Sequence, residues 1–250
     1  MHLPRMNIFK YLIIITAIFL CSCGASHNIV EEIIYKDDGF SYNHMKKNDV
    51  AIGGITSQQL TFTDDVRIQY SSLFSTVLLE NLKDVHSINI VNTSQLMQKI
   101  GRENYFNIMK EFDVEQTLID EAMGFIKESI PEVEYLIIAN IDNENIVDRS
   151  HRERIKDEKG EEKYETDYER TYYLTVEFHV YDLFQEEMIW NILMYNRAEK
   201  TETRTTETGC FESCITGAIQ DILFGSPAEI DREEVLAEIY KDFADKLAKQ

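Results

Sequence analysis

Residues Tyr135-Leu136-Ile137-Ile138-Ala139-Asn140-Ile141 decide the expected fold class. Successive side chains of a β-strand point to opposite faces of its sheet, and here both alternating sets are mostly apolar. A strand of this kind must be covered on both faces, as in sheets that carry helices on each side. We therefore expect residues 135–141 to form a central strand of an α/β domain with a mixed sheet flanked by helices.

The chain before this strand alternates between short apolar runs and helical patterns. Residues 50–55 form an apolar run that contains two glycines, and we expect the first buried strand there and a second one at 88–91. Apolar residues three and four positions apart predict helices over 64–82, 93–100, 105–112 and 118–130. Thr63 or Asp64 can cap the first of these helices, and Pro131 stops the last.

The chain after the central strand predicts a long charged β-hairpin. Residues 142–170 are polar and contain a turn at 156–160. Residues 174–181 alternate apolar and polar side chains like a half-buried strand, which places His179 on the polar face as a surface or cross-strand residue. A partner strand at 188–196 contains Trp190 and continues into 197–208, which is almost wholly Thr, Glu, Arg and Lys. Both faces of this hairpin carry charge.

The C-terminal part of the chain predicts a closing helix. Ser226-Pro227-Ala228-Glu229 combine an N-cap, a proline at the first helical position and a capping-box glutamate, and residues 231–234 offer a second start. Apolar residues at 235–247 then recur at helical spacing, which indicates packing on the sheet. A further short helix is expected at 211–223.

The N-terminus has the pattern of a secretion signal. Arg5 and Lys10 precede an apolar run at 11–20, far shorter than the roughly 20 residues that span a bilayer. Leu20-Cys21-Ser22-Cys23 resembles the lipobox of bacterial lipoprotein precursors, which implies cleavage after residue 22 and acylation of Cys23. Cys21 is a poorer acceptor because the large Leu20 precedes it. The alternative is a conventional cleaved signal with two incidental cysteines.

The lipobox resemblance also implies a location. Two or more acyl chains on Cys23 would anchor the mature protein firmly. Gly24 stands where an aspartate would be the usual signal for retention in the inner membrane, so the expected site is the outer membrane, facing the periplasm. We expect residues 23–47 to be a tether and residues 48–250 to form one periplasmic α/β domain.

Composition narrows the class of partner. The formal net charge of −20 becomes −22 once Arg5 and Lys10 leave with the signal. A chain of this charge repels nucleic acid and anionic surfaces, which argues against a nucleic-acid-binding protein. The 228 residues that remain after removal of the signal are enough to build a substantial core.

The order of elements resembles a group of periplasmic lipoproteins. The residues that carry the likeness are 49–57, 88–100, 135–141 and Val180-Tyr181-Asp182-Leu183 leading to Ile189-Trp190. The group comprises the curli-secretion channel family and the lipoprotein activators of penicillin-binding proteins. The resemblance implies a scaffold for contact with an envelope protein, without a catalytic centre or cofactor. Channel members insert hairpins with an apolar face into the membrane, and the charged hairpin of this chain does not fit that role.

Few residues suggest chemistry. Cys210 and Cys214 could form a structural disulfide, remain free thiols, or serve a metal or redox function. None of the six histidines has a recognisable metal-ligand spacing, and no phosphate-binding or hydrolase motif occurs. Trp190 and its neighbouring tyrosines (Tyr172, Tyr173, Tyr181 and Tyr195) are expected to pack the sheet rather than to line a binding face. Two hypotheses follow: a lipid-anchored, non-catalytic interaction or activator module, and an envelope hydrolase or ligand-binding lipoprotein without a linear motif.

Overall fold

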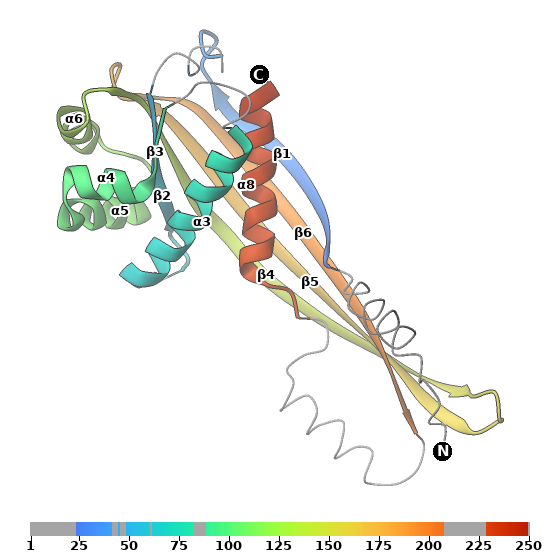
Figure 1. Cartoon of the computed structure of the whole chain (residues 1–250). Helices are drawn as coiled ribbons and strands as arrows, with labels where there is room; N and C mark the ends of the chain where they lie inside the picture. The colour runs from blue at the N-terminus through green and yellow to red at the C-terminus, as the bar shows by residue number, and fades with distance from the viewer. Residues whose placement is uncertain are drawn as a thin grey trace, which may run out of the picture.

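A six-stranded mixed sheet forms the centre of the protein (Figure 1). The computed structural model describes residues 24–41, 45, 49–60, 62–82, 89–207 and 229–249. The strand order is β1-β6-β5-β4-β2-β3. The strands are β1 (Ser26–Lys36), β2 (Asp49–Ser57), β3 (Ile90–Val91), β4 (Val133–Lys156), β5 (Glu162–Asp182) and β6 (Glu187–Glu207). The described helices are α3 (Asp64–Leu82), α4 (Thr93–Ile100), α5 (Arg102–Glu115), α6 (Asp120–Ser129) and α8 (Arg232–Lys249).

The predicted central strand is confirmed. β4 lies between β2, to which it is parallel, and β5, to which it is antiparallel. The pairing of β2 with β4 shifts register between Ile52 and Gly54, and Gly54 has a φ of +126°. A Cβ atom at Gly54 would collide with the hydroxyls of Tyr105 and Ser71, so only glycine lets the strand pass beneath these side chains.

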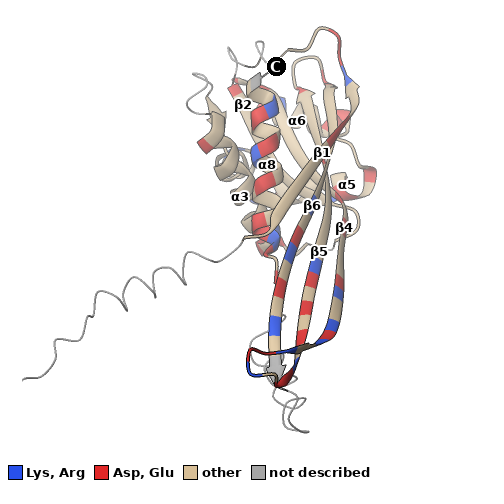
Figure 2. Ribbon diagram, turned by 90° about the vertical axis from the view of Figure 1, so that its right-hand side faces the viewer, with Lys and Arg blue, Asp and Glu red and all other residues tan. Residues whose placement is uncertain are grey.

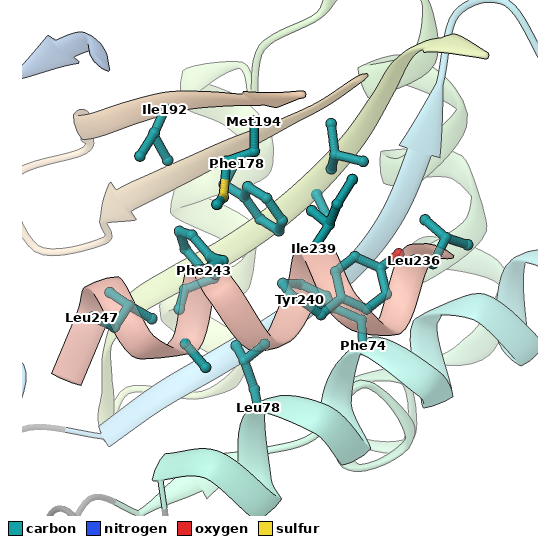
Figure 3. Close-up of a cluster of buried hydrophobic side chains, with 14 of the residues drawn as sticks. Phe74, Leu78, Phe178, Ile192, Met194, Leu236, Ile239, Tyr240, Phe243 and Leu247 are labelled. Carbon is teal, nitrogen blue, oxygen red and sulfur yellow. The ribbon is translucent and has the colours of Figure 1, made fainter. Parts of the chain in front are cut away.

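Helices α3 and α8 cover one face of the sheet, which we call the α8 face (Figure 3). Phe243 of α8 stacks on Phe178 of β5 with ring centroids 3.9 Å apart and an interplanar angle of 5°. Trp190, Phe74 and Tyr240 pack around this pair, and all five side chains are fully buried. The predicted closing helix is confirmed, and it contributes a large share of the main core.

Helices α4, α5 and α6 cover part of the opposite face, which we call the α5 face. Their apolar side chains form a second core with Leu136 and Ile138 of β4 and with Tyr181 of β5. Asn92 caps α4, because its side chain accepts a hydrogen bond from the Gln95 N–H in a reciprocal capping box. The two helical layers confirm the α/β class.

The structure corrects one expectation about the termini and decides between two starts predicted for the closing helix. Residues 26–36, expected within the 23–47 tether, form β1, which pairs with β6 along the edge of the sheet. This stretch forms a strand because the edge of β6 offers backbone hydrogen bonds and because Ile29 packs against the main core on the α8 face. Helix α8 begins at Arg232, where Asp231 accepts from the Glu233 N–H, so the second predicted start is the one used. Residues 226–228 and the helix expected at 211–223 lie outside the described residues.

The long hairpin extends well beyond the helices (Figure 1). β4 and β5 stay paired as far as Lys156 and Glu162, and β6 joins them as far as Glu207. Asp157 closes the turn by accepting hydrogen bonds from the backbone N–H groups of Lys159 and Glu161. The predicted charged hairpin and its turn are confirmed.

Candidate functional site

The sequence-predicted site residues Cys23, Cys210 and Cys214 lie outside the described residues. The nearest described neighbour of Cys23 is Gly24, whose Cβ position would lie 3.4 Å from Oε1 of Glu234 in the first turn of α8. Ala25 packs against the main core. The described chain therefore begins on the α8 face, at Gly24.

An uncovered area of sheet lies on the α5 face, beyond the edge of the helices (Figure 2). The strand register places three rows of side chains there, running from β1 across β6 and β5 to β4. We call this area the open face, and its rows are Glu32, Leu193, Glu177 and Asn140, then Val30, Tyr195, Thr175 and Asn143, then Asn28, Arg197, Tyr173 and Asn145. Asn140 and Thr175 are buried within these rows. No described helix lies over the second and third rows.

Two tyrosines dominate the open face. Tyr173 and Tyr195 are 38% and 39% exposed, and Val30 beside them is 55% exposed. The Tyr195 hydroxyl donates to a carboxylate oxygen of Glu32 at 3.4 Å. Tyrosine and arginine among amide side chains are typical of the surfaces that proteins use to bind one another. Trp190, Tyr172 and Tyr181 are buried, as expected for packing residues, whereas Tyr173 and Tyr195 are not.

The edge strand β1 adds apolar surface to one side of the open face. Ile33, Ile34 and Tyr35 are about half exposed, and the register with β6 shifts between Ile33 and Tyr35. A bulge on an edge strand disrupts the regular ladder that another chain would need for pairing. Lys246 of α8 holds Glu31 of this strand in an ion pair of 2.8 Å.

His179 is buried, so the prediction of a surface residue is wrong, whereas the alternative of a cross-strand residue agrees with its pairing opposite Ile138 and Asn191. Only 3% of it is exposed, because the edge of the Phe112 ring from α5 packs against the imidazole. Nε2 of His179 lies 3.4 Å from a carboxylate oxygen of Glu177, and Nδ1 lies 3.4 Å from the sulfur of Met188. The alternation of side chains along β5 is confirmed, but α5 covers the face that the pattern marks as polar.

Glu177 marks the boundary between the covered and the open parts of the α5 face. Burial raises the pKa of Glu177, but its contacts with His179, Asn191 and Asn140 outweigh burial and lower it overall. The Asn191 amide donates to Glu177 at 2.6 Å. A carboxylate held ionised in this way serves as a structural acceptor and is a weak proton donor.

A separate cleft of about 410 Å³ lies where β2 ends and α3 and α5 approach each other. Arg67 at its base is 1% exposed and donates to the Ile55 carbonyl at 2.8 Å and to the two carboxylate oxygens of Asp113 at 3.3 and 2.5 Å. The cleft is the place that a ligand-binding alternative would use. The Asp113 carboxylate compensates the charge of the Arg67 guanidinium, so this ion pair has a structural role.

Catalytic groups are sparse in the described ranges. Among these residues no group of three or more His, Cys, Asp or Glu side chains could hold a metal ion. None of the helices in the same ranges is long and apolar enough to cross a membrane.

Comparisons with known proteins gave structural matches only. No family model and no curated protein matches the chain. The PelC dodecamer of Paraburkholderia phytofirmans matches with 10% identity and a TM-score of 0.29, over 86% of this chain and 96% of that one. The C-terminal domain of LpoB from Salmonella enterica matches with 8% identity and a TM-score of 0.30, over 69% and 88% of the two chains. A lipoprotein of Neisseria meningitidis matches with 7% identity and a TM-score of 0.34, over 72% and 99%.

Proposed function

We propose that the mature chain is a lipid-anchored lipoprotein of the bacterial envelope that binds a protein partner through its open face and has no catalytic role. The acyl chains on Cys23 would hold it in the outer membrane, with the fold in the periplasm. The observation that carries this proposal is the open face itself, where Tyr173, Tyr195 and Val30 stay exposed beside the part of the sheet that the helices cover.

The surrounding polar groups support a binding role over a chemical one. Glu177 is engaged by His179 and Asn191, and Arg67 is paired with Asp113. These charged side chains already have hydrogen-bond and ion-pair partners within the protein, so their role is structural. Exposed tyrosines, in contrast, supply a large contact area at low cost in side-chain entropy. A rigid face with aromatic side chains at its centre fits a protein partner.

Anchoring is tested first. Cys23→Ala should leave uncleaved precursor in the membrane fraction and abolish labelling by a clickable fatty acid. Cys21→Ala is the matched control and should be processed and labelled like the parent chain. A Cys23→Ala chain that is still cleaved and labelled would show that the lipobox assignment is wrong.

The binding face is tested by crosslinking in living cells. A photo-crosslinking amino acid at Tyr195 or Tyr173 should give a discrete adduct with one envelope protein. The same amino acid at Val114, which is 70% exposed at the end of α5, is the control and should give none. Adducts of equal yield at all three positions would argue against the open face as the binding surface.

A further inference from the structure

The charged hairpin separates its charges by sign. Tyr172 and Ala198 face the main core, so every second residue from them toward the tip lies on the α8 face of the hairpin. That face has six basic and three acidic residues, a formal charge of +3: Arg152, Arg154, Lys156, Arg170, Lys200 and Arg204, with Asp148, Glu162 and Glu202. As far as Thr205 of β6, the other face has two basic and five acidic residues, a formal charge of −3: Arg149 and Lys163, with Glu153, Glu165, Asp167, Glu169 and Glu199.

Tyrosines accompany the basic face. The guanidinium of Arg152 lies 4.0 Å from the ring centre of Tyr164, and that of Arg204 lies 5.7 Å from the ring centre of Tyr168. Both rings lie on the α8 face of the hairpin. Tyrosine is enriched where one end of a side chain meets apolar surroundings and the other meets water, as at the surface of a bilayer.

The anchored end of the chain lies at the root of this same face. Ser26 pairs with Glu199, where the hairpin leaves the body, and Ala25 packs against the core on the α8 face. Only Gly24 and Ala25 separate Cys23 from β1, a reach of at most roughly 10 Å over three Cα–Cα steps. From this root the β5 strand continues about 30 Å to Glu162, at about 3.3 Å per residue. A bilayer that holds acyl chains at Cys23 is therefore next to the basic face.

We propose that the basic face of the hairpin lies on the anionic phospholipid headgroups of the bilayer that holds Cys23. This inference rests on the proposed lipid anchor. An acyl anchor combined with a basic patch is a common pair of membrane-binding signals. The large negative charge of the whole chain does not prevent the contact, because salt screens charges beyond about 8 Å at physiological ionic strength.

The contact is tested with the acylated full-length chain on vesicles that contain a headgroup-spin-labelled lipid. Tyr164→Trp places a fluorophore on the basic face, and Thr205→Trp places one on the acidic face at the same distance from the root. Trp190 is fully buried and contributes a constant background. With about 30% phosphatidylglycerol in phosphatidylcholine, we expect quenching of Tyr164→Trp only, and its loss in pure phosphatidylcholine or in about 0.5 M NaCl.

Charge variants make the test specific. Arg152→Gln, Arg154→Gln and Lys156→Gln together should weaken the contact of the hairpin with the bilayer roughly 100-fold, since each basic residue near an anionic surface contributes roughly fivefold. The control removes the same charge from the helices of the α5 face, through Lys99→Gln, Lys110→Gln and Lys127→Gln. This control should leave the quenching unchanged.

The possible failures are distinct. If the wild-type chain does not float with vesicles, the lipid anchor is wrong and this inference falls with it. If it floats but both tryptophans are quenched equally or neither is, only the hairpin contact is refuted. A change in Tyr164→Trp emission that depends on protein concentration, without vesicles, would assign the basic face to the acidic face of a second copy and would also refute the proposal.

Discussion

Replacement of Phe243 by alanine tests how far the closing helix stabilises the fold. The Phe243 side chain is fully buried between α8 and the sheet (Figure 3). Its ring stacks on Phe178 at 3.9 Å and lies 5.6 Å from the ring of Trp190 and 6.5 Å from that of Phe74. Alanine would remove a ring that packs against three other aromatic side chains.

The magnitude follows from burial and stacking. Truncation of a buried phenylalanine to alanine costs about 3–5 kcal/mol, because the transfer free energy is lost and a cavity remains. A well-stacked aromatic pair adds about 0.5–1.5 kcal/mol beyond the buried area. Since Phe243 is fully buried and stacks in parallel on Phe178, we expect the upper part of the range, about 4–5 kcal/mol. Phe243→Leu should lose about 1–2 kcal/mol, because much of the cavity stays filled.

Urea unfolding followed by Trp190 fluorescence measures the effect, since Trp190 lies beside the substituted ring. With a slope of about 2–3 kcal/mol/M, the midpoint should fall by about 1.3–2.5 M for Phe243→Ala. Phe184→Ala is the matched control, because that ring is 51% exposed, and it should lose less than about 1 kcal/mol. A loss below about 1.5 kcal/mol for Phe243→Ala, with an unchanged slope, would refute the role given to the closing helix.

Three further predictions concern a glycine, a carboxylate and the cysteines. Gly54→Ala should lower the free energy of unfolding in urea by about 2 kcal/mol or more, because φ is +126° and the new methyl group collides with a buried tyrosine. Gly124→Ala lies in open space within α6 and should raise the free energy of unfolding by up to about 1 kcal/mol. Equal effects of the two substitutions would contradict this prediction. The lowered pKa of Glu177 stabilises the folded state at pH values above the ordinary pKa of 4.5, and this stabilisation is lost as the pH falls through the folded-state pKa. Glu177→Gln should therefore make stability depend less steeply on pH in the acidic range. An unchanged acidic pH dependence would contradict the role given to Glu177. A disulfide between Cys210 and Cys214 would close a very short loop. Replacing both cysteines by serine should therefore lower the free energy of unfolding by clearly less than 3 kcal/mol, which is about the stabilisation that a disulfide gives when it closes a 15-residue loop. Thiol titration of the denatured, non-reduced protein decides whether the bond exists.

The sequence by itself determined the elements of this protein. Local spacing is sufficient for that task, because a strand or helix that must bury one face shows its period in the chain. The central strand at 135–141, the helices between 64 and 130, the charged hairpin and the closing helix were predicted from such patterns and are present. The lipobox at Cys23 is likewise a purely local signal, and it remains a prediction.

Only the tertiary structure decided which faces are covered. The alternation around His179 has the same appearance whether water or α5 lies above it, so burial of this side chain depends on a helix some 70 positions away in the chain. Residues 26–36 have little pattern of their own and become a strand because β6 offers an unpaired edge. The separation of charge on the hairpin needs the register of three strands, since a shift of one residue would exchange the two faces. Long-range contact therefore determines the surfaces on which function is expected.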